Sequence, residues 1–481
     1  MFKRAAPPPP QQPPPAPRGI YYGCYGDEQK GYQPQFFKGD EHFLLIGPTR
    51  SGKGRSILAP NLILDCSRSA LVVDPKGELA GWTARHRAGA GHEIVYLDPF
   101  RELAQDARLA TTEKDAVLPA TSRGFNPLRW LDPASDLFVD DVMSATEAIV
   151  QVNPNASDPH WAESAQDVVA GLTMHEVAEK REFASYGAIR EILSVDDHTF
   201  GTYCAEVCAK PRHPLIPNKL ARFIPLSDLK AKDNRELASI LSTARTQTRF
   251  LDSPLIAADL AGSKGEAFAF GDMKRKLMTV YLVLPPAYLI THAKWLRLIL
   301  DAAIRALQRV PSRTSTHDVL FMLDEFAQYG RLNSIETSIA LNAGYGIKIF
   351  AVVQSLAQLK HLYRENWETI VSGGVIASFG PRDYFTSEYL AKLTGQSLRN
   401  KKGTTLSPTG GPSVSVTPEY HYTMMPHELR QMPRGKLLAF IPTRKGGQEM
   451  RECAAFDFSA LDGRNGVPEV GRWVQQSYRL G

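Results

Sequence analysis

Residues 43–64 read FLLIGPTRSGKGRSILAPNLIL, in which two apolar segments flank a glycine-containing loop. The short run at 43–46 predicts a buried strand, and the residues after the loop predict a helix. Gly47 and Gly52 let the backbone curl so that successive N–H groups face phosphate oxygens, while Lys53 reaches the outer phosphates. A chance glycine turn is the alternative, but the strand before it and the helix after it favour a phosphate-binding loop.

The loop departs from the standard motif at one position. A Ser or Thr normally follows the lysine and gives its hydroxyl to Mg2+, whereas Gly54 stands here. Ser56, Ser51 or a water molecule could take that place, so we expect ATP and Mg2+ as cofactors and leave the metal geometry open. The residues predicted to bind the nucleotide are Gly47, Thr49, Arg50, Ser51, Gly52, Lys53, Gly54 and Arg55.

Further apolar runs recur along the chain, separated by stretches typical of helices. They are short and uniformly apolar, as in strands that are buried on both faces of a parallel sheet. Their alternation with helices predicts an α/β fold with a doubly wound, mostly parallel sheet. The predicted strands are residues 43–46, 70–73, 94–97, 279–284, 319–323, 347–353, 374–379 and 436–441.

The interval 130–252 lacks this alternation of strands and helices, because its sequence shows helical patterns and almost no apolar run typical of a strand. Ala165, Val168, Val169 and Leu172 recur at the spacing of one helix face. We therefore expect an all-helical domain inserted into the α/β core. The predicted organisation is a proline-rich extended leader at 1–38, core residues 39–129, the insertion at 130–252, core residues 253–460 with a mobile loop or hairpin at 397–421, and a carboxy-terminal tail at 461–481.

An acidic pair ends another predicted strand, in the sequence VLFMLDEF at 319–326. We expect Asp324 to hold Mg2+ and Glu325 to polarise the attacking water as a general base. Alone, such a pair would often be a solvated turn, but its position downstream of a phosphate loop favours the functional interpretation. Gln354 ends the next apolar run and is predicted to contact the γ-phosphate or the attacking water; a hydrogen-bonded loop residue is the alternative.

An arginine completes the predicted catalytic set. Arg382 follows the run at 374–379 and is predicted to act as an arginine finger in a neighbouring subunit's site, where it would neutralise transition-state charge. A surface arginine paired to Asp383 is equally compatible with the sequence. Arg331 and Arg364 are rival candidates for the finger.

Composition narrows the class of protein. The chain has 481 residues, 43% of them hydrophobic and 22% charged, which is typical of a globular protein with a large core. No run approaches the roughly 20 apolar residues of a membrane span, and five scattered cysteines indicate reduced thiols. The net charge of +5 leaves DNA contact and solvated faces both open for the basic clusters. These are Lys274 to Lys276, Arg399 with Lys401 and Lys402, and Arg245 with Arg249.

Several blocks, taken in order, resemble the coupling proteins of conjugation and type IV secretion. Among them are GPTRSGKG (47–54), VVDPKGELAGWTA (72–84), DPHWAESAQDVVAGL (158–172), LDEFAQYGRLNSIE (323–336) and AGYGIKIFAVVQSLAQL (343–359). The resemblance implies a RecA-like motor domain with an inserted all-helical domain. By position, Lys53 and Asp324 match the family's two nucleotide motifs, Glu325 the base and Gln354 the motif after the acidic strand. Asp74, Lys76 and Glu78 match a block to which chemistry assigns no role.

The resemblance also implies an activity and partners. These are ATP-driven recruitment and translocation of DNA and attached protein to a type IV secretion or conjugation channel, by a homo-hexamer that meets relaxosome or effector proteins. Family members usually carry amino-terminal membrane helices, and only 46 residues, none membranous, precede the loop here. We therefore expect a cytoplasmic chain, peripheral at the inner face of the plasma membrane. The alternative is a nucleotide-gated receptor or docking module with little hydrolysis; Gly54 favours it, whereas Glu325 favours the motor.

Overall fold

The computed structural model describes residues 19–460 except residues 28, 30, 106–121, 153–158, 229–234, 263–267, 408, 409, 444 and 445. The predicted tail at 461–481 and the first eighteen residues of the predicted leader lie outside the described residues.

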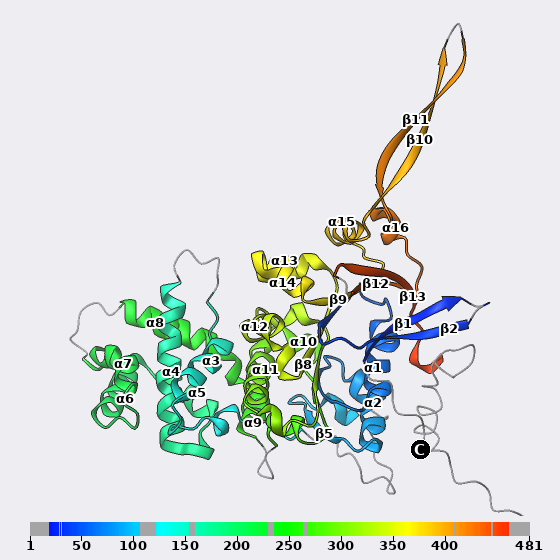
Figure 1. The fold of residues 1–481 in the computed structure, drawn as a ribbon. Coiled ribbons are helices and arrows are strands. Elements are labelled where there is room, and N and C mark those ends of the chain that lie inside the picture. Colours follow the sequence, from blue (N-terminus) through cyan, green and yellow to red (C-terminus); the bar gives the residue numbers. More distant parts are fainter. Residues whose placement is uncertain are drawn as a thin grey trace, which may run out of the picture.

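One large sheet organises the chain (Figure 1), in the order β2-β1-β13-β12-β9-β3-β8-β7-β4-β6-β5. From β9 to β5 the neighbouring strands are parallel, whereas β12, β13, β1 and β2 extend the sheet with antiparallel pairs. The bounds are β1 Ile20–Asp27, β2 Gly31–Phe37, β3 His42–Ile46, β4 Ser69–Val73, β5 Glu93–Leu97, β6 Met278–Leu282, β7 Val319–Leu323, β8 Ile347–Val353, β9 Gly374–Phe379, β12 Lys436–Pro442 and β13 Gln448–Ala454.

Every predicted apolar run forms a strand, and the predicted doubly wound, mostly parallel architecture is confirmed. The reason is visible in β4, whose alternate side chains enter two different cores. Leu71 and Val73 belong to the core on the side of helix α11 (Ala293–Gln308). Ala70 and Val72 belong to the core on the side of helices α1 (Ala59–Leu64) and α2 (Glu78–Gly89). A strand with no solvent-facing side has no need of polar residues, which explains the uniform runs.

The residues before the phosphate loop fold differently from what the sequence predicted. Residues 20–37, assigned above to an extended leader, form β1 and β2 at the far edge of the sheet. Asn61 anchors β1, since its Oδ1 accepts from the Tyr21 N–H at 2.8 Å and its Nδ2 donates to the Tyr21 carbonyl at 2.8 Å. The sheet therefore begins at residue 20.

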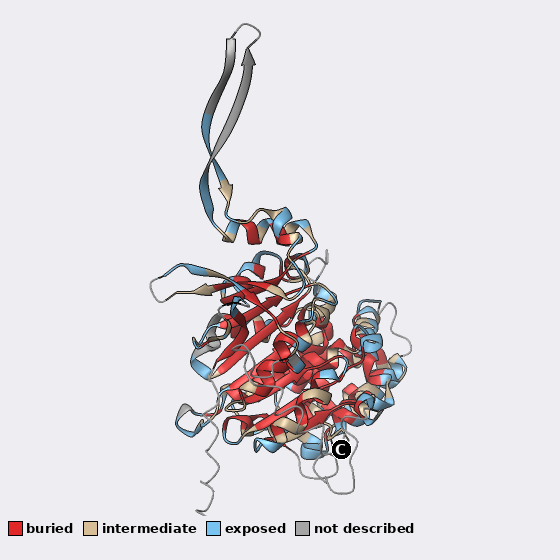
Figure 2. Ribbon diagram, turned by 90° about the vertical axis from the view of Figure 1, so that its right-hand side faces the viewer, coloured by how far each residue is buried: buried red, intermediate tan, exposed pale blue. Residues whose placement is uncertain are grey.

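Helices cover both faces of the sheet, as Figure 1 shows, and Figure 2 shows the buried residues concentrated in the sheet and the helices against it. On one face lie α1 and α2, and on the other α11 to α14. The bounds of these helices, and of α10, α15 and α16, are α1 Ala59–Leu64, α2 Glu78–Gly89, α10 Pro286–Leu289, α11 Ala293–Gln308, α12 Asn333–Leu341, α13 Leu356–Tyr363, α14 Trp367–Ser372, α15 Tyr384–Leu393 and α16 Pro426–Arg430.

Between β5 and β6 every described element is helical, and these helices stack beyond α11, away from the sheet (Figure 1). The four residues that predicted one helix face, Ala165 to Leu172, lie on α4 and are all buried. The α-helices of this insertion are α3 Phe138–Ile149, α4 His160–Lys180, α5 Tyr186–Ser194, α6 Asp197–Ala209, α7 Ile216–Leu220, α8 Arg235–Thr248 and α9 Pro254–Ala261.

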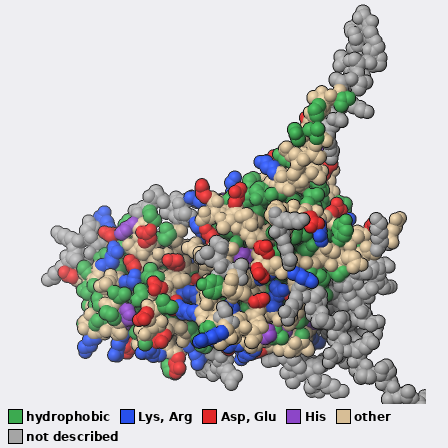
Figure 3. All heavy atoms as spheres, viewed as in Figure 1, with side chains coloured by type: hydrophobic (Ala, Val, Ile, Leu, Met, Phe, Trp, Pro, Cys, Tyr) green, Lys and Arg blue, Asp and Glu red, His purple; other side chains and the backbone are tan. Residues whose placement is uncertain are grey.

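The interval 397–421 forms a hairpin of β10, Gln396–Ser407, and β11, Gly410–Tyr422. It stands away from the body of the molecule as a two-stranded sheet of its own (Figure 1). In the space-filling view of Figure 3, acidic and basic side chains are interspersed over the helices between β5 and β6. Of the two sequence interpretations, a loop or a hairpin, the hairpin is correct. None of the described helices has the length and apolar character that crossing a bilayer requires.

Candidate nucleotide site

The predicted site residues meet at one edge of the sheet. β3, β8, β7 and β4 are parallel neighbours, and Ile46 pairs with Val353 while Leu323 pairs with Ala351. Their carboxyl ends therefore lie side by side, where ligands bind in open α/β sheets. The phosphate loop follows β3, Gln354 follows β8, Asp324 and Glu325 follow β7, and Asp74 follows β4.

The loop after β3 is tightly curled and fits a phosphate group. Gly52 has φ 94° and Arg50 has φ 64°, a conformation that costs little only for glycine. The Ser56 N–H donates to the Gly52 carbonyl at 2.8 Å and starts the helical segment that continues into α1. A Cβ on Gly47 would lie 2.8 Å from Ser51 Oγ, and that hydroxyl is buried with no hydrogen-bond partner in the described structure. A curled backbone around an unsatisfied hydroxyl is suited to phosphate oxygens.

Lys53 is folded back over the loop. Its Nζ donates to the carbonyls of Gly47 at 2.7 Å and Pro48 at 3.2 Å. Burial lowers the pKa of Lys53, while the nearby carboxylates of Asp324 and Glu325 oppose the shift and Lys76 adds to it. The lysine and the acidic pair therefore share one electrostatic environment.

The acidic pair is constrained by its backbone and by Gln354. Glu325 adopts a left-handed conformation with φ 56°, and its N–H donates to Asp324 Oδ1 at 3.0 Å. Gln354 Nε2 donates to Glu325 Oε2 at 3.0 Å. The pKa of Asp324 is raised to about 6, chiefly by burial and next by Glu325, against the opposing effect of Lys53. The structure thus brings Lys53, Asp324, Glu325 and Gln354 together.

Gly54 lies beneath an aromatic ring. A Cβ at this position would sit 3.6 Å from the Trp82 ring on α2, so the usual hydroxyl position faces an indole. Of the substitutes considered above, Ser51 offers the buried unsatisfied hydroxyl, and Ser56 is also buried. With the Asp324 carboxylate, these oxygens are the donors that Mg2+ prefers.

Arg55 points away from the loop, toward the end of the described chain. Its Nε and Nη2 bond both carboxylate oxygens of Asp457, and its guanidinium lies over the rings of Trp82 and Phe458. Asp457 carried no signal in the sequence, because it is 402 residues from its partner.

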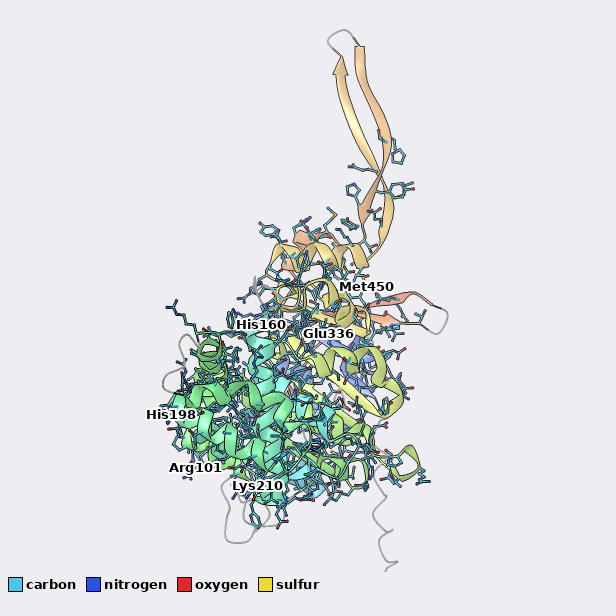
Figure 4. All side chains as sticks on the ribbon, turned by 90° about the vertical axis from the view of Figure 1, so that its left-hand side faces the viewer. Arg101, His160, His198, Lys210, Glu336 and Met450 are labelled. Carbon is cyan, nitrogen blue, oxygen red and sulfur yellow. The ribbon has the colours of Figure 1, made fainter. Side chains whose placement is uncertain are left out.

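The arginines considered for the arginine finger differ in their contacts. Arg382 follows β9, the neighbour of β3, and is exposed without an ion pair among the residues that the structure describes. Asp383 caps α15 by accepting from the Thr386 N–H at 2.8 Å, and in the part of the chain that the structure describes it forms no ion pair with Arg382. Arg331 instead forms an ion pair at 3.0 Å with Glu336 of α12, labelled in Figure 4.

Two further side chains belong to the same edge. Asp74 is buried, accepts from the Ala80 N–H at 2.8 Å, and has its pKa raised to about 7, first by burial. The sequence marked Asp74 through the block that matches the coupling proteins, although chemistry assigned it no role. Tyr329 carries a buried hydroxyl that has no hydrogen-bond partner in the described structure, and its pKa is raised first by burial and then by the charges of Asp324, Glu325 and Asp74. Nothing in the sequence marked Tyr329.

The basic clusters that suggested DNA contact are mostly engaged within the fold. Lys274 is buried and donates to the Leu307 carbonyl at 2.8 Å. Its neighbours Arg275 and Lys276 pair with Asp272 and Glu93. Arg245 binds the Leu193 and Val195 carbonyls and Asp197 inside the insertion. These charges stabilise the fold, whereas the side chains of Arg399, Lys401 and Lys402 lie outside the described part.

Comparison with known proteins places this chain in a family. A family model described as type IV secretory system conjugative DNA transfer matches residues 15–447. The conjugal transfer protein TraG of Escherichia coli is 27% identical over 412 residues, which cover 81% of this chain and 60% of TraG. The protein VirD4 of Agrobacterium fabrum strain C58 is 27% identical over 387 residues, which cover 76% and 51%. The chain thus spans between half and three fifths of the length of these relatives.

Solved structures share the fold. The plasmid coupling protein TrwB in complex with ADP and Mg2+ superposes with a TM-score of 0.63 at 14% identity, covering 88% of this chain and 87% of TrwB. TrwB with a non-hydrolysable ATP analogue gives a TM-score of 0.61 at 15% identity, covering 87% and 86%. This likeness confirms the predicted RecA-like fold. With the family model matching most of its length, the chain belongs to the type IV secretory system conjugative DNA transfer family.

Proposed function

We propose that this chain binds ATP with Mg2+ at the loop after β3 and hydrolyses it to recruit DNA, with attached protein, and move it to a type IV secretion or conjugation channel. The observation that carries the proposal is the hydrogen bond from Gln354 to Glu325, formed where Lys53 and Asp324 share one electrostatic environment. A carboxylate held by an amide beside a phosphate loop is arranged for proton abstraction, for which a passive binding site has no need.

Each residue then has a role in the reaction. Lys53 exchanges the Gly47 and Pro48 carbonyls for the outer phosphate oxygens, and the N–H groups of the loop bind the inner ones. Glu325, oriented by Gln354, accepts the proton of the attacking water. Mg2+ held at Asp324 and a serine hydroxyl would neutralise charge on the phosphates. Arg382, exposed beside this edge, is proposed to enter the site of a neighbouring subunit in a homo-hexamer.

The partners follow from the family. The family model describes conjugative DNA transfer, and relatives include TraG and VirD4. We propose relaxosome or effector proteins as cargo, channel components as the docking surface, and a peripheral position at the inner face of the plasma membrane. A nucleotide-gated docking module with little hydrolysis is the second candidate, favoured by Gly54 beneath Trp82.

The test is ATP turnover with and without DNA, alongside binding of a fluorescent ATP analogue. We expect Lys53→Ala to lose binding, and Glu325→Gln to keep it while turnover falls roughly 10²-fold or more, the scale of a lost general base. Glu206→Gln, at an exposed acid of α6, is the matched control and should behave like the parent. Parent-like turnover in Glu325→Gln would remove the assigned base. Binding without measurable turnover in the parent would favour the docking module.

A further inference from the structure

The turn that follows β4 lies at the nucleotide edge and carries a lysine for which the reaction proposed above has no role. Val73 ends β4 and pairs with Leu323, which ends β7, so residues 74 and 324 leave the sheet side by side. The turn consists of Asp74, Pro75, Lys76 and Gly77, and α2 begins at the next residue. Because the strand order is β3-β8-β7-β4, this turn and the phosphate loop lie on opposite sides of the acidic pair.

Hydrogen bonds fix the shape of the turn. The Asp74 N–H donates to the Leu282 carbonyl of β6 at 2.9 Å, and the Gly77 N–H donates to the Asp74 carbonyl at 3.1 Å. The Asp74 carboxylate accepts from the Ala80 N–H at 2.8 Å and so satisfies one of the free donors in the first turn of α2. Gly77 has φ 66°, a left-handed conformation that costs little for glycine. The backbone that carries Lys76 is therefore held in one conformation.

Lys76 is the exposed residue of this turn. Asp74, Pro75 and Gly77 are buried, whereas Lys76 is exposed. Among the residues that the structure describes, Lys76 forms neither an ion pair nor a hydrogen bond through its side chain. Lys53 differs in this respect, because its ammonium group donates to two carbonyls of its own loop. The turn thus presents an unengaged ammonium group at the nucleotide edge.

The positive charge of Lys76 acts on two side chains of the nucleotide site. Burial lowers the pKa of Lys53, and the charge of Lys76 adds to that shift. Burial raises the pKa of Asp324, and the charge of Lys76 opposes that shift. The two ammonium groups repel each other, and an anion bound between them removes this repulsion. The arrangement therefore favours a multiply charged anion between Lys53 and Lys76.

We propose that Lys76 binds the terminal phosphate of the bound triphosphate from the side opposite Lys53, so that the site prefers a triphosphate to a diphosphate. This role rests on the proposed function. Lys53 reaches the outer phosphates from the loop after β3, and the terminal phosphate lies toward the acidic pair, where Glu325 activates the attacking water. A diphosphate lacks the group that Lys76 binds, so hydrolysis removes this contact and leaves the contacts of the loop.

Competition binding measures the preference. The full chain is loaded with Mg2+ and a triphosphate that carries a fluorophore on its ribose, and the competitors are ADP and an ATP analogue that is not hydrolysed. A hydrogen bond between charged groups contributes roughly tenfold or more to affinity. Lys76→Met should therefore weaken binding of the ATP analogue about tenfold or more, and leave binding of ADP within about threefold of the parent.

Two controls separate a phosphate contact from a change in the fold. Lys210→Met removes another exposed lysine, at the end of α6 and labelled in Figure 4, and should change neither affinity. Because Lys76 is exposed, Lys76→Met without nucleotide should melt within about 2 °C of the parent. The ATP analogue with Mg2+ should raise the melting temperature of Lys76→Met less than that of the parent, whereas ADP should raise both equally.

The outcomes separate the two proposals. Equal weakening of the ATP analogue and ADP in Lys76→Met would overturn the contact with the terminal phosphate, because the charge would then act on any nucleotide. Parent-like affinity of Lys76→Met for the analogue would also overturn it and leave the phosphate loop standing. If the parent bound neither nucleotide, or Lys53→Ala bound both as the parent does, the proposed function would fall together with this role.

Discussion

Arg87 donates hydrogen bonds to backbone carbonyls at and beyond the end of α1, the helix that follows the nucleotide loop. Replacing Arg87 is the sharpest test of how that loop is supported. Its side chain is 1% exposed. Three of its hydrogen bonds go to backbone carbonyls at and beyond the end of α1, and two go to side chains. The partners are Leu62 O at 2.8 Å, Asp65 O at 3.2 Å, Arg68 O at 2.7 Å, Thr279 Oγ1 at 2.6 Å and His92 Nδ1 at 3.3 Å.

Arg87→Met keeps most of the buried stem and removes all five contacts. Each lost hydrogen bond from a charged donor costs about 1.5–3 kcal/mol, and three carbonyls lose their donor. The variant no longer buries a guanidinium, which offsets several kcal/mol, so we expect a net loss of about 3–5 kcal/mol. At about 2–4 °C per kcal/mol, the melting temperature should fall by roughly 10 °C.

Thermal unfolding followed by tryptophan fluorescence measures this loss. Arg212→Met is the control, because Arg212 forms an exposed ion pair with Glu179, where such pairs contribute at most about 1 kcal/mol. A fall in Arg87→Met no larger than in Arg212→Met would refute the reasoning that the carbonyls at and beyond the end of α1 depend on Arg87.

Three further outcomes are expected. Burial raises the pKa of Asp259 to about 6, so the contribution of Asp259 to the free energy of unfolding grows as the pH falls from about 7 toward 4. The stability deficit of Asp259→Asn should therefore widen by roughly 2–3 kcal/mol over that range, when unfolding is measured at several pH values. A deficit independent of pH would contradict this. Mixing Arg382→Ala with Lys53→Ala should partly restore turnover if Arg382 works across an interface, and no rescue at any ratio would count against the finger. Replacing residues 397–421 by a short turn should leave the melting temperature within about 1 °C, because within the described structure β10 and β11 pair with each other and not with the large sheet. A larger fall would show that the hairpin supports the body.

The parallel core was predictable because its strands have no solvent face. The strands that were missed, β1, β2 and β13, carry glycine, glutamine, proline and charged residues, as in GYQPQFF at 31–37. They lie in the antiparallel extension, where side chains are partly exposed and the pattern of a buried strand disappears. Their pairing also joins residues of opposite ends of the chain, such as Cys24 with Ala454, which no local signal reports.

The positions of the site residues could be predicted where those residues follow the end of a predicted strand. Asp324 and Gln354 each follow a buried run directly, and the loop that carries Lys53 follows another, so parallel pairing brings the three together. The position of Arg55 could not be predicted, because Asp457 comes from the other end of the chain. The basic clusters were poor indicators of DNA contact for a different reason. The sequence does not show whether carbonyls and carboxylates inside the fold already bind these charges, as the Leu307 carbonyl binds Lys274.

The place at which the helical insertion leaves the sheet has an evolutionary consequence. Among the strands that the structure describes, β5 lies at the edge of the sheet and pairs with β6 alone, and the insertion joins these two. Its length and sequence can therefore change, or another helical domain can replace it, without disturbing the order of the strands that carry the nucleotide site. The insertion and the site can thus evolve separately, and chimaeras that exchange the residues between β5 and β6 with those of a relative offer a direct way to test this.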